Sequence, residues 1–130
     1  DIIFRTVPPE EMESYYRAAD AVVLASVSEG LARSLIESSS FGLPCLVHRY
    51  GVTEYVLGQS GYYADLTGPG ALGSLIRSTA AEWALPNLRQ QRHEVVATRF
   101  SWEVLRGSYI ELLRRGAELS QTNPESYARG

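Results

Sequence analysis

Short apolar runs alternate along this chain with longer segments in which apolar residues recur at helical spacing. Residues 21–25 (AVVLA) and 45–48 (CLVH) are continuous apolar runs, a pattern typical of parallel strands that are buried on both faces. Residues 2–7 and 61–65 are two further strand candidates. Because strand and helix patterns alternate, the sequence predicts an α/β fold, a Rossmann-like parallel sheet with flanking helices.

Helices are predicted where apolar residues recur every three or four positions, with proline near the start or glycine near the end. In the helix predicted over residues 31–41, we expect Leu31, Leu35, Ile36 and Ser39 to face the core. The other predicted helical segments are residues 10–19, a single turn at 53–57, residues 67–83, residues 86–100 and a last helix after Ser101.

The composition changes near Gly116, after which the chain becomes polar. We therefore expect residues 1–116 to form one partial domain and residues 117–130 to form a polar C-terminal tail. The chain opens directly in a strand-like run without an initiator Met. We interpret it as a fragment, a trimmed form or a processed product.

Charge and cysteine content narrow the possible functions. The net charge is −3, so no nucleic-acid-binding surface is expected. All 12 basic residues are Arg, which excludes a lysine Schiff base within this segment. Cys45 is the only cysteine and is interpreted as a small buried apolar residue. Two distant His residues and one Cys show no metal-ligand spacing. A cytoplasmic location fits these features.

The most informative chemistry lies in the run EGLARSLIE, residues 29–37. Glu29 precedes the predicted helix and Glu37 lies within it, so two carboxylates flank a helix start at the carboxyl end of a parallel strand. Free amides and the helix dipole favour an anion at such a place. Two acids beside a phosphate site suit a ligand that also carries hydroxyl groups, such as a nucleotide sugar.

Helical spacing places Glu37 on the same face as Gly30, Arg33 and Ser34, away from the core-facing residues. Arg33 could then contact a phosphate. The alternative is that both acids and Arg33 are ordinary surface residues. The spacing of Glu29 and Glu37 alone would favour that alternative, and only the surrounding motifs shift the balance.

Those motifs resemble the donor-binding domain of GT-B retaining glycosyltransferases, specifically family 4, which carries an E-x7-E motif. The resemblance rests on LASVSEGLARSLIESSSFGLPCLV and on four shorter motifs. These are YRAAD at residues 16–20, GVTE at 51–54, GYY at 61–63 and FSWE at 100–103. It implies that residues 1–116 are the second half of a nucleotide-sugar-binding Rossmann-like domain.

The resemblance also implies roles for single residues. Glu29 would lie near the donor sugar at the reacting centre and act in catalysis. The helix start, Gly30 with the amides of Leu31 and Ala32, would contact the sugar or diphosphate, with Arg33 as an extra phosphate contact. Glu37 would accept hydrogen bonds from the ribose hydroxyls. The family's second glycine is Ala32 here, and its methyl group would limit the approach of a ligand.

The resemblance further implies what a parent protein would supply: two earlier strand–helix units with a basic pair for the diphosphate, and an N-terminal acceptor domain. The donor is a substrate, and neither a cofactor nor a metal is expected. The parent would transfer sugar to a saccharide or lipid-linked acceptor, in the cytoplasm or peripherally at the inner membrane, and the segment alone would be inactive. Two alternatives stay open, a nucleotide-sugar 2-epimerase and a non-catalytic Rossmann-like binding or assembly domain.

One structural expectation follows from the missing units. The strand predicted at residues 2–7 would lose both of its neighbours in the doubly wound strand order. We therefore expect it to pair directly with residues 21–25, or with a second copy of the chain.

Overall fold

A computed structural model describes residues 1–122 of the chain. Residues 123–130, which belong to the predicted polar tail, lie outside the described residues. The chain divides into two compact units, Asp1–Ala97 and a second unit that begins at Thr98. Each unit is described by itself.

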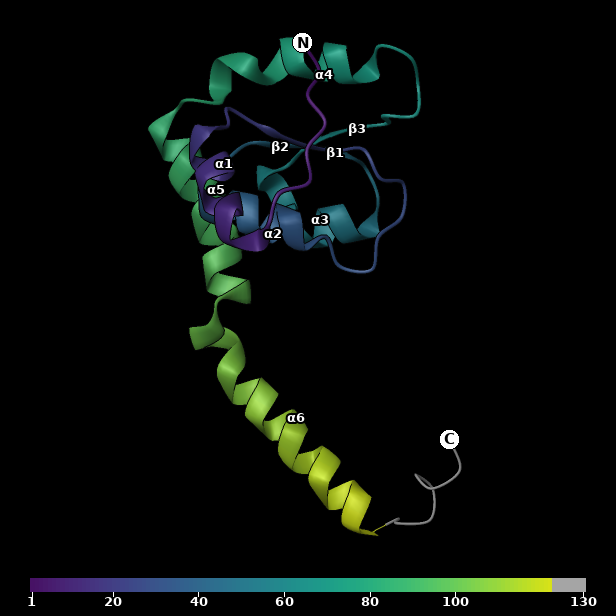
Figure 1. The fold of residues 1–130 in the computed structure, drawn as a ribbon, viewed down its shortest axis with the longest axis vertical. Helices are drawn as coiled ribbons and strands as arrows, with labels where there is room; N and C mark the ends of the chain where they lie inside the picture. Colours follow the sequence, from purple (N-terminus) through teal and green to yellow (C-terminus); the bar gives the residue numbers. More distant parts are fainter. Residues whose placement is uncertain (123–130) are drawn as a thin grey trace. The chain divides into compact units, whose positions relative to one another are not determined.

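The first unit is built on a parallel sheet of three strands in the order β1-β2-β3 (Figure 1). The strands are β1 (Val22–Leu24), β2 (Cys45–His48) and β3 (Tyr62–Ala64). Val23 lies opposite Leu46, and Val47 lies opposite Tyr63. The predicted α/β class and parallel sheet are thus confirmed.

Helices cover both faces of this sheet. Helices α2 (Arg33–Ser40) and α3 (Gly51–Leu57) lie on one side, and α4 (Ala71–Thr79) lies on the other (Figure 1). The remaining helices are η1 (Pro9–Glu11), α1 (Met12–Ala18), η2 (Gly58–Ser60), η3 (Ala80–Glu82), α5 (Pro86–Phe100) and α6 (Trp102–Thr122). This arrangement is that of part of a Rossmann-like domain.

The predicted strand at residues 2–7 does not form. Residues 1–8 contain neither helix nor strand, and the side chains of Ile2, Ile3 and Phe4 are 84%, 73% and 93% exposed. Strand β1 pairs with β2 alone, so the expected pairing of residues 2–7 with residues 21–25 is wrong. Strand propensity depends on packing against neighbours, and this segment has no strand beside it. Its pairing with a second copy stays a prediction.

Burial differs between the strands because of their positions in the sheet. The central strand β2 is buried at Cys45, Leu46 and Val47, as predicted. Strand β1 is an edge strand, and Val23 within it is 43% exposed. The prediction that residues 21–25 are buried on both faces is therefore wrong for β1. A continuous apolar run indicates a strand but does not say whether its neighbours are present.

Helix α2 begins two residues later than predicted. Leu35 and Ser39 are buried as expected, but Leu31 precedes the helix and is 50% exposed. The turn after α2 places Gly42 at φ 73°, in the left-handed region. A β-carbon on Gly42 would lie 2.4 Å from Cγ of Arg89. Gly42 therefore both ends α2 and allows α5 to pack closely.

Arg92 of α5 is a buried charged residue that sequence analysis did not select, since it lies in a polar run. It is only 2% exposed. Its guanidinium donates hydrogen bonds to the carbonyl oxygens of Gly42 and Trp83 at 3.3 and 3.0 Å, and to the Tyr62 hydroxyl at 3.1 Å. One side chain thus joins α5 to the α2–β2 turn, to the residues after η3 and to β3.

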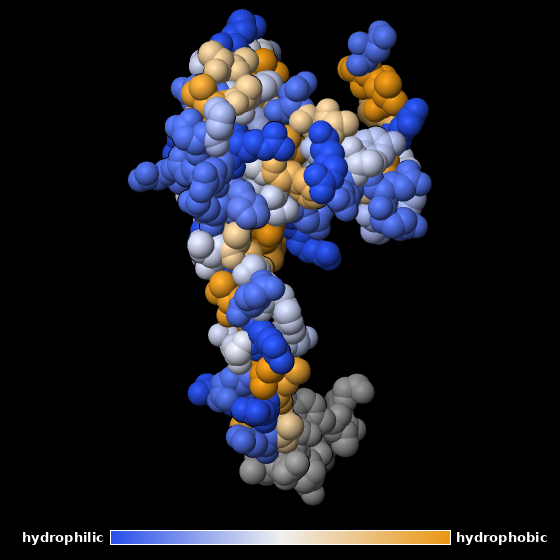
Figure 2. All heavy atoms as spheres, turned by 90° about the vertical axis from the view of Figure 1, so that its left-hand side faces the viewer, coloured by the Kyte–Doolittle hydropathy of each residue, from blue (hydrophilic) through white to orange (hydrophobic). Residues whose placement is uncertain are grey.

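The second unit contains the long helix α6, which continues beyond Gly116 to Thr122. Apolar side chains along this helix are exposed (Figure 2). Trp102, Leu105, Tyr109, Leu112 and Leu119 follow the three- and four-residue spacing of an amphipathic stripe. Across residues 1–122, no helix is both long and apolar enough to cross a membrane.

Candidate functional site

The predicted site lies between β1 and α2. Residues 25–32 form the loop from Leu24 to α2, and Glu29 is exposed within it. Tyr50 lies in the next connection, between β2 and α3. Since β1 and β2 are parallel, their carboxyl ends meet at one edge of the sheet. The two loops are therefore neighbours at the edge where ligands bind in open α/β sheets.

The charge of Glu29 affects the phenol of Tyr50. The pKa of the Tyr50 phenol is raised, first by burial and then by the negative charge of Glu29. The Tyr50 hydroxyl is buried and has no hydrogen-bond partner among the described residues. Sequence analysis did not select Tyr50. Its place directly after the second predicted strand was the available signal.

Glu37 is held from two sides on α2. The Tyr16 hydroxyl of α1 donates a hydrogen bond to Oε2 of Glu37 at 3.1 Å. Arg33, one turn earlier on α2, places Nη2 3.8 Å from Oε1. The side chain of Glu37 is 44% exposed and that of Arg33 is 83% exposed. The Glu37 carboxylate is thus oriented by protein contacts while part of it stays open to solvent.

The start of α2 offers backbone amides as donors. The amide of Arg33 is already bonded to the carbonyl of Leu31 at 2.9 Å. Within residues 1–122, the amides of Leu31 and Ala32 donate to no other residue. Leu31 is half exposed, whereas Ala32 is only 3% exposed. Of the two residues, Leu31 is therefore the one that meets solvent.

Burial of Ala32 also changes the interpretation of its methyl group. The sequence comparison suggested that this methyl would limit the approach of a ligand. In the structure the residue is packed into the protein, so the methyl does not project toward solvent. Gly30 nearby has no atom within 4 Å of the place a β-carbon would take, and no contact within the described chain requires glycine there.

Two polar side chains close to this edge have partners of their own. Arg49 pairs with Glu54 at 2.9 Å. His48 accepts a hydrogen bond at Nδ1 from the amide of Leu66 at 3.1 Å, as expected of a residue with a structural role. Among the described residues, no three His, Cys, Asp or Glu side chains gather as metal ligands would.

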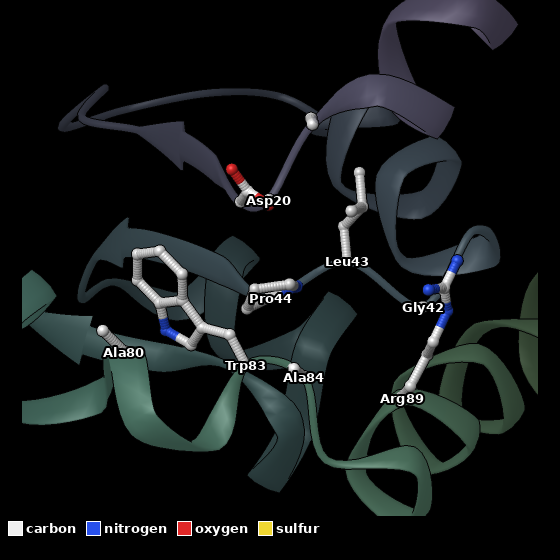
Figure 3. A pocket seen from close by; sticks show the side chains of 9 residues that line it. Asp20, Gly42, Leu43, Pro44, Ala80, Trp83, Ala84 and Arg89 are labelled. Atoms are coloured by element: carbon white, nitrogen blue, oxygen red, sulfur yellow. The ribbon is translucent and has the colours of Figure 1, made fainter.

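A separate cavity of about 340 Å³ lies at the opposite edge of the sheet (Figure 3). Asp20 borders it just before β1, and Leu43 and Pro44 border it just before β2. Trp83 and Arg89 form part of the wall on the other side. None of the six predicted site residues lines this cavity. The predicted site residues and this cavity are therefore separate places on the first unit.

Comparison with known proteins identifies the family of this chain. Residues 2–92 match the model of a family described as glycosyl transferases group 1. The chain belongs to this family. The resemblance to GT-B glycosyltransferases is thus confirmed at the level of this family. The matched range of this group 1 glycosyltransferase chain also includes all six predicted site residues.

Curated relatives point to the same class of protein. The chain is 30% identical to a "D-inositol 3-phosphate glycosyltransferase" of Corynebacterium urealyticum over 123 residues, which are 90% of this chain and 28% of that protein. It is 31% identical to the protein of that name from Corynebacterium jeikeium over 115 residues, 81% of this chain and 26% of that protein. The group 1 chain thus spans little more than a quarter of the length of these relatives. Glycosyltransferase names do not favour the 2-epimerase or the non-catalytic alternative.

Proposed function

We propose that this chain forms the helix-start half of the donor site in a retaining glycosyltransferase of family 4, with Glu29 and Glu37 as its E-x7-E motif. The donor is a nucleotide sugar. Glu37 accepts hydrogen bonds from the ribose hydroxyls, and Glu29 lies beside the sugar at the reacting centre. The observation that supports this most is the oriented, half-exposed Glu37 carboxylate on a helix that starts at the carboxyl end of β1.

The phosphates of the donor would lie at the start of α2. The free amide of Leu31 and the positive end of the helix dipole favour negative charge there. Arg33 is long, mostly exposed and 3.8 Å from Glu37, so it can swing toward a phosphate without breaking a short hydrogen bond. Gly30 and Ala32 shape the loop that presents these groups.

Transfer itself requires more than these residues. Neutralising a leaving diphosphate and holding an acceptor across a cleft account for most of the barrier reduction in such a reaction. We expect a larger protein that contains this chain to supply the remaining cationic groups and the acceptor domain, so the segment alone is inactive. The acceptor is a saccharide or a lipid-linked molecule. The relatives' names add a phosphorylated cyclic polyol to the acceptors worth testing. Such a protein would act in the cytoplasm or peripherally at the inner membrane.

The test is steady-state transfer and donor binding by that larger protein with Glu29→Ala or Glu37→Ala. Loss of the ribose contact should weaken donor binding by about 1–3 kcal/mol in Glu37→Ala. Glu29→Ala should lower kcat more than it lowers donor affinity. The matched control is Glu13→Ala, which also removes a helical glutamate paired with an arginine four residues away. Normal transfer by both site variants would refute the assigned roles.

A further inference from the structure

Tyr16 contacts the proposed ribose-binding carboxylate from a different helix. We infer that Tyr16 is a positioning residue for the donor, holding one oxygen of Glu37 so that the other faces the ribose hydroxyls. This inference rests on the proposed function. It adds to that proposal a residue that has no place in the E-x7-E motif.

The ring of Tyr16 is fixed in place by its surroundings. Tyr16 is 7% exposed and stacks on the Phe41 ring at 5.5 Å between centroids, with 27° between the ring planes. The Arg17 guanidinium lies 5.3 Å from the centroid of the same Phe41 ring. Phe41 directly follows α2, so these contacts hold α1 against the helix that carries Glu37.

The hydrogen bond from Tyr16 gives the two oxygens of the Glu37 carboxylate different environments. Oε2 accepts from the Tyr16 hydroxyl at 3.1 Å. Within residues 1–122, Oε1 has only Arg33 nearby, at 3.8 Å, which is beyond hydrogen-bond distance. Oε1 can therefore accept from a ligand hydroxyl. A carboxylate held in one orientation loses less side-chain freedom when a ligand binds.

The phenol can serve as a donor at every physiological pH. Burial, and then its hydrogen bond to Glu37, raises the pKa of Tyr16 to about 12. The proton of this hydrogen bond therefore stays on Tyr16. A purely structural tyrosine would show the same packing but would not affect how ribose hydroxyls are recognised.

Two nucleotides that differ only in their ribose hydroxyls can distinguish a positioning role of Tyr16 from a purely structural one. The larger protein is titrated with UDP, GDP and ADP, and the tightest of them is compared with its 2′,3′-dideoxy form. The variants are Tyr16→Phe, which keeps the ring on Phe41, Glu37→Ala and the double variant. The control is Tyr15→Phe, since Tyr15 is the neighbouring residue and its hydroxyl accepts from Arg5 rather than contacting Glu37.

We expect Tyr16→Phe to weaken binding of the ribonucleotide on the order of tenfold and to leave dideoxynucleotide binding unchanged. Adding Tyr16→Phe to Glu37→Ala should weaken binding no further. Equal weakening for both nucleotides, or additive effects in the double variant, would overturn the inference while Glu37 keeps its role. If Glu37→Ala weakens binding of the two nucleotides equally, or weakens neither, the proposed ribose contact is wrong and the inference falls with it.

Discussion

At the scale of single residues, Arg92 shows how a buried charge can be satisfied by backbone. No carboxylate forms a salt bridge with it among the described residues. Its partners are carbonyl oxygens and the Tyr62 hydroxyl, which in turn donates to Glu82 at 3.1 Å. Because buried carbonyls without partners are costly, this one side chain stabilises the packing of three segments.

Arg92→Met should therefore lower the free energy of unfolding by about 3 kcal/mol, since Met fills the space but leaves several buried acceptors without donors. Urea unfolding followed by circular dichroism measures this. Arg77→Met is the control because Arg77 is exposed on α4, where a change of about 0.5 kcal/mol or less is expected. Equal effects for the two variants would contradict the role given to Arg92.

The phenol of Tyr63 makes the free energy of unfolding fall as the pH rises in the alkaline range. Burial, and then the nearby Glu54 carboxylate, raises its pKa from 10.0 to about 12. The fold thus favours the protonated phenol, so the stabilisation is complete below pH 10 and is lost as the pH rises toward about 12. Tyr63→Phe should flatten the fall in unfolding free energy between these values more than Tyr55→Phe, a change at a residue 60% exposed. A pH profile identical to that of the unmodified chain would contradict this.

At the scale of elements, the connection from α2 to β2 is set by one glycine. Gly42 has φ 73° and no room for a β-carbon, with the carbonyl oxygen of Arg89 2.8 Å from that position. Gly42→Ala should lower the free energy of unfolding by about 2 kcal/mol through backbone strain and displacement of α5.

Gly107, unlike Gly42, lies within a helix and has room for a β-carbon. It lies inside α6, and nothing is within 4 Å of its β-carbon position. Gly107→Ala should raise helix stability by about 0.5–1 kcal/mol, measured as a gain in helical circular dichroism. If Gly42→Ala proves as harmless as Gly107→Ala, the account of the turn is wrong.

The same elements show which sequence signals are reliable. Strand β2, helix α2 and the glycine between them were predicted because apolar runs, helical spacing and a C-terminal glycine are local signals. Residues 2–7 carry an equally apolar pattern but form no strand, because a strand also needs a neighbour. Leu31 was assigned to the core because the helix start was placed two residues too early.

The candidate site, like the fold, could be predicted only in part from the sequence. The sequence pattern pointed to Glu29 and Glu37 through their places around one helix start. It placed Tyr16 in the YRAAD motif and Tyr50 directly after a predicted strand but assigned a role to neither, because Tyr16 meets Glu37 only when α1 packs beside α2. Glu29 and Tyr50 interact only because β1 and β2 are adjacent and parallel. Tertiary contacts of this kind have no signature in spacing along the chain.

At the scale of the whole molecule, the chain is a part of the architecture its family uses. It spans 28% of one relative and 26% of another, and its sheet has three strands with β1 at an edge. We therefore propose that this chain supplies the groups that recognise ribose and sugar. The rest of a larger protein would hold the acceptor and neutralise most of the diphosphate charge.

The most direct test of this account is a crystal structure of that larger protein with a bound nucleotide sugar. The account predicts ribose hydroxyls within hydrogen-bond distance of Glu37, the sugar beside Glu29 and a phosphate near the amide of Leu31. A nucleotide bound instead in the cavity between Asp20 and Trp83, at the amino ends of β1 and β2, would contradict it.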